Sequence, residues 1–390
     1  MHTRVGIVGA GPAGLVLGHL LSMAGIESVI LESRSRDYVE KRVRAGVLEQ
    51  GTVDLLNAIG VGDRMRREGL VHRGIRLRFD GEEHRIPISD LTGGRAITVY
   101  GQQEVVKDLI RARLDSGGQI LFGAEVESID GIETPNPTIR YRQNGESHAL
   151  SCDWIAGCDG SHGVTRHAIP ADGLTVYAKK YPFAWLGILA EAVPSSDELI
   201  YAYHPRGFAL HSMRSPQISR LYLQVRSDES IDNWPDERIW AELHMRLVLP
   251  GWSLNEGPII EKGIATMRSH VIEPMRHGQL FLLGDAAHIV PATGAKGLNL
   301  AVADANVLAT AIATWYQTGQ TDFLDAYSAT CLRRVWRAEH FSWWMTSMLH
   351  RFEDDSPIDQ RLQLSQLRYV CSSTAAATTL AENYVGLERV

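Results

Sequence analysis

Residues 280–288 read LFLLGDAAH, and Pro291, Gly294, Gly297 and Asn299 follow soon after. The pattern predicts a buried apolar strand that ends in a carboxylate, then a glycine-spaced turn that opens into a long helix. A helix N-terminus attracts phosphate, and a carboxylate beside it can accept hydrogen bonds from hydroxyl groups. The stretch therefore suits a ligand that carries both sugar-like hydroxyls and a phosphate.

A glycine-rich segment near the N-terminus strengthens this interpretation. Residues 9–14 read GAGPAG, directly after a short predicted strand at 5–8 and directly before a predicted helix. In such a turn Gly9 permits the tight bend, Gly11 lets a pyrophosphate approach the backbone, and Gly14 lets the helix pack closely on the strand. The context predicts dinucleotide binding.

An acidic residue ends the next predicted strand, where dinucleotide-binding proteins hold a ribose. That strand spans 28–31, and Glu32 follows it 18 residues beyond Gly14 (32 minus 14). The distance is close to the ~20 residues typical of the fingerprint. This fingerprint alone does not distinguish NAD from FAD.

Two further acids at strand ends favour FAD. FAD is a long cofactor, so the protein must bind both its adenosine half and its flavin half. Gly284-Asp285 carries one of these acids, and residues 154–166, WIAGCDGSHGVTR, repeat the theme of a strand followed by Asp-Gly. No second glycine fingerprint is present, so we expect no separate nicotinamide-binding domain. In this order the three elements resemble those of the flavoprotein aromatic hydroxylases.

Composition and charge exclude several other classes. A chain of 390 residues with 44% hydrophobic and 22% charged residues has room for two to three domains. Its net charge of -7 does not favour nucleic-acid binding. The first strand begins near residue 4, and we see no apolar run near the ~18 residues of a membrane span. With no CxxC and no histidine ligand spacing, we expect a cytoplasmic protein without a metal site.

The elements predict an α/β protein with an inserted sheet. We expect a Rossmann-like FAD-binding domain at 1–178, completed by 268–300, with an antiparallel substrate-binding sheet at 179–267. Residues 300–390 are predicted to be helical, with helices at 301–316, 323–352 and 360–383. Aromatic residues in this last part, such as Trp336 and Trp343, are typical of a core or a subunit interface, which makes a homodimer plausible.

Polar residues share one face of the predicted inserted sheet. Residues 199–204 and 208–214 read as a hairpin, and a period of two places Ser212 and Arg214 on the same face. In the next strand Arg220 and Tyr222 alternate with apolar residues. An arginine flanked by hydroxyls can bind a carboxylate bidentately. The pattern alone allows a solvent-facing polar surface equally well.

Longer matches point to one branch of the hydroxylases. RAGVLEQG at 44–51, GDAAHIVP at 284–291 and AENYVGL at 381–387 accompany Tyr201 and Arg214. With these residues the chain resembles, over nearly its whole length, the family members that act on 4-hydroxybenzoate. The resemblance implies that O2 and NAD(P)H are consumed, that a flavin C4a-hydroperoxide delivers the oxygen, and that 3,4-dihydroxybenzoate is the product.

The same resemblance assigns the substrate contacts. Tyr201 would contact the substrate hydroxyl, Tyr384 would contact Tyr201, and His72 would lie at the solvent end of this proton relay. The remaining implied substrate-binding residues are Ser212, Met213, Arg214, Tyr222, Ala292 and Thr293.

FAD contacts are implied in the same way. Lys296 would raise the positive potential near the flavin, and Arg220 would influence the flavin position. The implied cofactor-binding residues are Gly9, Gly11, Ala13, Gly14, Glu32, Arg42, Val43, Arg44, Ala45, Gly46, Val47, Gln102, Arg220, Asp285, Lys296, Leu298 and Asn299.

Reductant contacts follow from matched positions, although the chain departs from the family there. Ser33 and Arg34 stand where NADPH-selective relatives have arginine and glutamine, yet Arg34 and Arg36 could receive a 2′-phosphate. We therefore favour NADPH and leave NADH open. Ala292 replaces a second proline and Ala13 a hydroxyl residue. The implied NAD(P)H contacts are Tyr38, Arg42, Arg44, His162, Arg166 and Arg268.

Two alternatives stay open. One is a hydroxylase of a related acid, such as 3-hydroxybenzoate or 4-aminobenzoate, because Arg214 would serve any benzoate. The Tyr201–Tyr384 pair discriminates between these substrates. The other is a non-catalytic protein with an FAD-binding fold, which would need no polar pocket strand.

Overall fold

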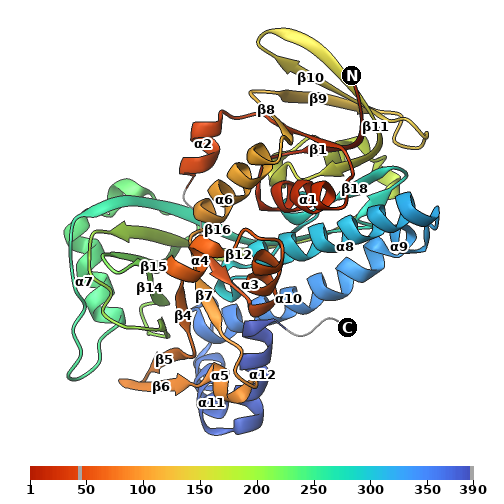
Figure 1. The fold of residues 1–390 in the computed structure, drawn as a ribbon. Helices are drawn as coiled ribbons and strands as arrows, with labels where there is room; N and C mark the ends of the chain where they lie inside the picture. Colours follow the sequence, from red (N-terminus) through yellow and green to blue (C-terminus); the bar gives the residue numbers. More distant parts are fainter. Residues whose placement is uncertain (43–45, 387–390) are drawn as a thin grey trace.

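The computed structural model describes residues 1–42 and 46–386. Val43, Arg44 and Ala45, which the sequence assigns to the cofactor, lie outside the described residues. Figure 1 shows two sheet-containing parts joined along their length, with the C-terminal helices below.

The first sheet carries the cofactor motifs. Its central strands run in the order β18-β11-β1-β2-β8 and pair in parallel, while β17, β9 and β10 add antiparallel pairings. Val5 and Ile7 of β1 are fully buried because helices cover the sheet. The strands are β1 (His2–Val8), β2 (Ser28–Glu32), β8 (Gln119–Phe122), β9 (Glu125–Asp130), β10 (Thr138–Gln143), β11 (Glu146–Gly157), β17 (Arg276–His277) and β18 (Leu280–Leu282).

The second sheet forms the inserted part. Its order is β19-β16-β12-β15-β14-β13-β5-β6, and every pairing is antiparallel except that of β13 with β5. One face packs on α7, the other on C-terminal helices. The strands are β5 (Ile75–Phe79), β6 (Glu82–Ile86), β12 (Thr175–Ala190), β13 (Leu199–Ala202), β14 (Ala209–Ser215), β15 (Ile218–Arg226), β16 (Ile259–Glu273) and β19 (His288–Ile289).

Helices surround both sheets, and a small third sheet connects them. That sheet has the order β3-β7-β4, with β3 (Val47–Leu48), β4 (Leu70–His72) and β7 (Ile97–Val99). The α-helices are α1 (Pro12–Met23), α2 (Arg36–Lys41), α3 (Gln50–Ala58), α4 (Asp63–Glu68), α5 (Ile88–Leu91), α6 (Gln102–Asp115), α7 (Asp236–Arg246), α8 (Gly297–Thr318), α9 (Asp322–Asp325), α10 (Tyr327–Leu349), α11 (Pro357–Ser372) and α12 (Thr374–Val385).

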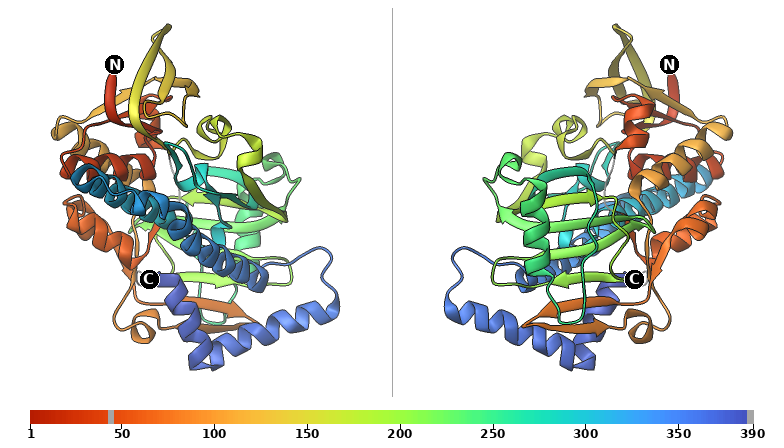
Figure 2. Two further views of the ribbon diagram at one scale, coloured as in Figure 1. Left: turned by 90° about the vertical axis from the view of Figure 1, so that its right-hand side faces the viewer. Right: turned by 90° about the vertical axis from the view of Figure 1, so that its left-hand side faces the viewer.

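The predicted fold class is confirmed, and the structure refines three details. Residues 75–86 supply β5 and β6 to the second sheet, which makes that sheet mixed. The domain limits near 178 and 268 fall within β12 and β16, so the proposed division stays a prediction. The helix predicted at 360–383 is two helices, because Ser373 ends α11 and caps α12. Figure 2 shows α11 along the lower edge of the molecule.

Helix α8 differs from the sequence expectation about apolar runs. Its 22 residues are long and apolar enough to cross a membrane by length and composition alone, because an 18-residue stretch of the helix has a mean hydropathy of 1.3. More than half of that apolar stretch is buried inside the protein, where α8 packs on α1 and α10. We therefore assign α8 to the core.

Replacement of Phe281 should destabilise the cofactor sheet. Phe281 is fully buried on β18, between Trp154 and Tyr327 at ring-centroid distances of 5.8 and 5.2 Å. Phe281→Ala should lower the free energy of unfolding by roughly 3–5 kcal/mol because it leaves a cavity. Urea denaturation of the apoprotein measures the change. The control Val193→Ala, at an exposed position, should change it by less than about 0.5 kcal/mol.

Candidate functional site

Three glycine-acid segments meet at one edge of the first sheet. The carboxyl ends of β1, β11 and β18 are joined by hydrogen bonds from Cys158 N to Val8 O (2.8 Å) and from Leu283 N to Gly157 O (2.9 Å). The segment after β18 also reaches the first turn, since a Cβ at Gly284 would lie 3.6 Å from the Cβ of Ala13. The edge therefore gathers the groups that the sequence assigns to one dinucleotide.

The glycines of the first turn play different roles. Gly9 has a φ of +105°, and a Cβ there would lie 2.3 Å from Cys158 O. A Cβ at Gly14 would lie 2.1 Å from Gly9 O, so both positions need glycine for the fold. A Cβ at Gly11 would meet nothing within 4 Å. Gly11 thus leaves room at the N-terminus of α1, which fits the pyrophosphate of FAD.

Glu32 is held at the end of β2 by backbone amides. Its carboxylate accepts hydrogen bonds from Ala10 N and Arg34 N, each at 2.8 Å. The side chain remains partly exposed beside the glycine turn. This placement fits a group that accepts a hydrogen bond from a ribose hydroxyl.

A buried acid fixes the turn that presents Asp285. Asp304 of α8 accepts hydrogen bonds from Gly284 N (3.0 Å) and from His288 Nε2 (2.7 Å). Burial opposes charge on His288, but Asp304 raises the pKa of its imidazole above the usual value. Asp285 itself is exposed and can face the ribityl chain. The sequence pattern at 280–299 did not indicate a role for Asp304. Asp304 lies on α8 and contacts Gly284 and His288 only after the chain has turned back.

Asn299 and Lys296 brace the loop at 47–49. Asn299 Nδ2 donates to Val47 O (3.0 Å), and its Oδ1 accepts from Glu49 N (2.9 Å). Lys296 Nζ is buried 2.6 Å from Glu49 Oε1. Burial lowers the pKa of Lys296, while Glu49 acts in the opposite direction. Glu49 Oε2 also lies 2.9 Å from Arg334 Nη2, so two cations share one carboxylate and the cluster keeps a net positive charge. Leu298, which lies between Lys296 and Asn299 in the chain, is partly buried.

The residues assigned to the reductant, apart from Arg44, are exposed or partly exposed. Burial lowers the pKa of His270, and Arg166 and Arg268 lower it further, so both guanidinium groups lie near one imidazole. Tyr38 is exposed beneath the guanidinium of Arg34 at 5.4 Å. Arg42 and His162 are exposed and Gln102 is partly exposed.

A small pocket lies between the second sheet and the loops at 46–47 and 292–295. Its volume is about 60 Å³, and it brings together most of the predicted substrate-binding residues. Sequence reasoning missed five of its residues, although alternation along β13 and β14 already places Leu199 and Leu210 on this face. The lining residues are Gly46, Val47, Val99, Trp185, Leu199, Tyr201, Leu210, Ser212, Met213, Arg214, Arg220, Tyr222, Ala292 and Ala295.

The pocket lining includes Tyr201, one of two phenols whose hydroxyls are bonded to each other. The hydroxyls of Tyr201 and Tyr384 form a short hydrogen bond, and both side chains are buried. Burial raises the pKa of Tyr201 above its usual value, and the bond to Tyr384 opposes this only in part. Tyr201 is therefore a neutral hydroxyl at neutral pH.

We expected His72 to lie at the solvent end of a proton relay through this pair, but the structure buries it. Its side chain is 1% exposed on β4, and burial lowers the pKa of His72 to about 4. Neither ring nitrogen hydrogen-bonds to a residue that the structure describes. His72 ends β4 and pairs with Ile97 of β7, a neighbour that the sequence around residue 72 does not reveal.

The lining also carries two cationic side chains, Arg214 and Arg220. Burial lowers the pKa of Arg214, with Tyr222 acting against this effect and Arg220 adding to it. Arg220 Nε lies 3.3 Å from Tyr222 Oη. The Ser212 hydroxyl donates to Arg220 O at 3.0 Å. A guanidinium group among hydroxyls suits the carboxylate of a small acid. Thr293 is buried just outside the lining.

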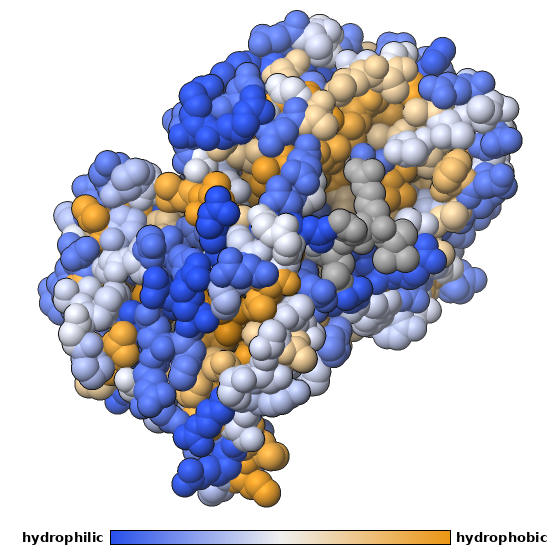
Figure 3. All heavy atoms as spheres, turned by 60° about the horizontal axis from the view of Figure 1, so that its bottom comes forward, coloured by the Kyte–Doolittle hydropathy of each residue, from blue (hydrophilic) through white to orange (hydrophobic). Residues whose placement is uncertain are grey.

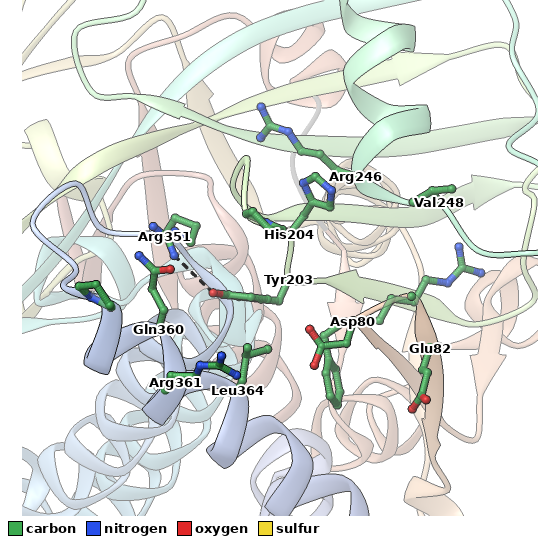
Figure 4. A pocket seen from close by; sticks show the side chains of 15 residues that line it. Asp80, Glu82, Tyr203, His204, Arg246, Val248, Arg351, Gln360, Arg361 and Leu364 are labelled. Atoms are coloured by element: carbon green, nitrogen blue, oxygen red, sulfur yellow. Dashed lines mark hydrogen bonds between the residues drawn. The ribbon is translucent and has the colours of Figure 1, made fainter.

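A larger cavity of about 560 Å³ lies elsewhere, between the β5–β6 hairpin, the turn after β13 and α11. Figure 4 shows Arg351 pointing toward Tyr203 there. Arg78 and Arg246 in its wall are already paired with Glu83 and Glu242. Of the predicted site residues within 1–42 and 46–386, none lines this cavity.

Comparison with known proteins agrees with this geometry. The family model described as FAD binding domain matches residues 2–342, and the chain belongs to this family of FAD-binding flavoproteins. Within it, the chain is 51% identical to p-hydroxybenzoate hydroxylase from Acinetobacter baylyi over 389 residues, 99% of this chain and 96% of the relative. The predicted family, flavoprotein aromatic hydroxylases, is confirmed.

More distant relatives share the fold. A 3-(3-hydroxy-phenyl)propionate/3-hydroxycinnamic acid hydroxylase from Mycobacterium sp. (strain JLS) is 25% identical over 78% of this chain and 52% of the relative. The crystal structure of p-nitrophenol 4-monooxygenase PnpA from Pseudomonas putida DLL-E4 matches with a TM-score of 0.86 at 20% identity, covering 99% of each chain. Aklavinone-11 hydroxylase, solved with FAD and aklavinone, matches with a TM-score of 0.73 at 21% identity, over 89% of this chain and 69% of that one.

Substitution of Gly11 should separate cofactor binding from folding. Gly11→Val adds atoms where the protein has open space, so the chain should fold but bind FAD at least about tenfold more weakly. Absorbance at flavin wavelengths after reconstitution measures binding, and urea denaturation of the apoprotein measures folding. Full FAD affinity in Gly11→Val would contradict the assignment of this turn to the pyrophosphate.

Proposed function

We propose that the chain is an FAD-dependent monooxygenase that converts 4-hydroxybenzoate, O2, NADPH and a proton into 3,4-dihydroxybenzoate, water and NADP+. The observation that carries the proposal is a single pocket lining that contains both Arg214 and Tyr201, whose hydroxyl is bonded to that of Tyr384. The 51% identity to p-hydroxybenzoate hydroxylase supports it. FAD, when bound, takes electrons from the nicotinamide and supplies the oxygen-transfer chemistry.

The phenol pair prepares the substrate hydroxyl. A buried phenol keeps its proton more firmly than a free one, because desolvation disfavours the anion. Tyr201 is neutral, so its O–H can donate to the substrate oxygen while Tyr384 donates to Tyr201. A hydrogen bond to the charged oxygen favours the phenolate, which makes the adjacent ring carbon electron-rich.

The cationic side chain of Arg214 sets the orientation of the substrate ring. Arg214 pairs with the substrate carboxylate, and Tyr222 and Ser212 lie beside it. Two anchored ends leave a flat ring little freedom to rotate, so one ring carbon faces the side of the pocket formed by Gly46, Val47 and Ala295. That side adjoins the cofactor loops, and this placement selects the position of hydroxylation.

Two features of the chain bear on the reductant and on the cellular compartment. Arg34 and Arg36 follow Glu32 closely enough to receive a 2′-phosphate, and we therefore propose NADPH over NADH. All four cysteines are free, and three of them are buried. Free thiols are typical of a reducing compartment, which supports the cytoplasm.

A homodimer is supported by helix α11. Ile358, Leu362 and Tyr369 are 66%, 61% and 59% exposed, and their spacing places them on one face of the helix. Figure 3 shows a largely hydrophilic surface interrupted by apolar areas. We propose that α11 packs against a second copy of the chain through this face.

Substrate conversion tests the proposed function. The wild type should oxidise NADPH faster with 4-hydroxybenzoate than without it, and 3,4-dihydroxybenzoate should accumulate. Arg214→Met should weaken 4-hydroxybenzoate binding roughly 100-fold because the carboxylate loses its partner. Tyr201→Phe should reduce hydroxylation far more than binding. Chromatography identifies the product, and a panel with NADH and with 3-hydroxybenzoate or 4-aminobenzoate tests specificity. Hydrogen peroxide as the sole product would refute the hydroxylase.

Light scattering after size-exclusion chromatography tests the dimer. The wild type should have twice the mass of one chain, whereas Leu362→Glu should shift toward the monomer, because a charge placed in an apolar interface opposes association. Gln317→Glu, at an exposed end of α8, is the matched control and should remain dimeric. A dimer unchanged by Leu362→Glu would exclude this face.

A further inference from the structure

The last turn of α10 carries a histidine that is bonded on both ring nitrogens. Trp185 Nε1 donates to His350 Nε2 at 2.7 Å, and His350 Nδ1 lies 3.0 Å from Thr346 O. An indole N–H can only donate, so Nε2 must be the acceptor. Nδ1 therefore carries the proton and donates to Thr346 O. The surroundings fix both the tautomer and the ring orientation of His350.

Aromatic rings on both sides complete the fit. His350 stacks on Phe183 and Phe208, with centroids 4.6 and 4.4 Å away. Trp185 stacks on Phe208 at 5.2 Å and contacts Tyr222 at 4.9 Å. Trp185 and Tyr222 both line the proposed substrate pocket, whereas His350 does not. His350 thus contacts this wall of the pocket from behind.

The same turn holds the opposite wall through a hydroxyl. Thr346 Oγ1 donates to Ser342 O at 2.7 Å and lies 2.8 Å from Thr293 Oγ1. Because the Thr346 proton is already used, Thr293 must be the donor in this contact. Thr293 follows Ala292, which lines the pocket. One helical turn is therefore bonded to β12 through Trp185 and to the loop after β19 through Thr293.

We propose that His350 and Thr346 are positioning residues that set the spacing between two walls of the substrate pocket, the Trp185 wall and the Ala292–Thr293 wall. This inference rests on the proposed function of that pocket. The ring of a small acid is held by contact on both sides, and a displacement of about 1 Å can reduce the rate roughly a hundredfold. The bonds of α10 prevent that displacement.

The arrangement requires an uncharged imidazole. A second ring proton would place an N–H of His350 against the N–H of Trp185, and burial lowers the pKa of His350 to about 3. The hydrogen bonds of His350 to Trp185 and Thr346 therefore persist across the neutral pH range. Only a substitution removes them.

His350→Phe is the direct test, because it keeps a flat ring in the stack but removes the acceptor for Trp185. In the FAD-loaded enzyme we expect the dissociation constant of 4-hydroxybenzoate, measured from the change in flavin absorbance, to rise about tenfold. The fraction of oxidised NADPH that yields product should fall, with hydrogen peroxide making up the difference. FAD affinity should be unchanged. The matched control His340→Phe changes an exposed histidine of the same helix and should match the wild type.

Two further variants distinguish positioning from general destabilisation. His350→Gln offers an amide oxygen to Trp185. It should recover part of the lost coupling, which is the fraction of oxidised NADPH that yields hydroxylated product. In a Trp185→Phe background, which lacks the indole N–H, His350→Phe should have little additional effect on coupling. Should His350→Phe not fold, Thr346→Val supplies the test, since it removes only the hydroxyl bonded to Thr293 and should also lower coupling.

Unchanged affinity and coupling in His350→Phe, or fully additive losses in the double variant, would overturn the inference. A wild type that makes no hydroxylated product would instead refute the proposed function. The two failures differ, because the wild type is measured first.

Discussion

The parallel pairing of β18 with β11 brings the chain back to the cofactor sheet after it has crossed the whole second sheet. This pairing places the turn at Gly284 and the N-terminus of α8 beside the first glycine turn. The same return carries the loop after β19 against the strand face that bears Tyr201 and Arg214. One strand of three residues therefore positions the glycine turns and the pocket loop to which the sequence assigns FAD and the substrate. Its burial between helices explains why residues 280–282 are uniformly apolar.

Local sequence signals were sufficient for much of this. The glycine turn with its strand, helix and Glu32 predicts the cofactor edge, and the alternation of Ser212 and Arg214 predicts a shared face that the structure shows in the pocket lining. Contacts between distant residues left no such signal. Glu49, which forms an ion pair with Lys296, is 247 residues away from it, and the partners of Trp185 lie on α10. No pattern around residue 72 reveals the pairing of His72 with Ile97 of β7. Likewise, β5 and β6 join the second sheet through pairing with β13, because strand pairing is decided by tertiary packing.

Polar groups buried in the pocket explain why a specific ligand class is expected there. Removing a guanidinium group from water is unfavourable by several kcal/mol unless an anion or well-placed hydrogen bonds compensate. A carboxylate beside Arg214 can form charge-assisted hydrogen bonds with the guanidinium group, whereas a neutral ring cannot. Two neutral phenols, those of Tyr201 and Tyr384, can stabilise an oxygen anion without adding charge to the site. The pocket is thus complementary to a molecule that carries both a carboxylate and a phenol.

A crystal structure of the protein with FAD and 4-hydroxybenzoate tests this complementarity most directly. We predict that the carboxylate lies within hydrogen-bonding distance of the Arg214 guanidinium group and that the phenol oxygen lies within hydrogen-bonding distance of Tyr201 Oη. A ligand bound in the reverse orientation, or outside the pocket lined by these two residues, would contradict the account.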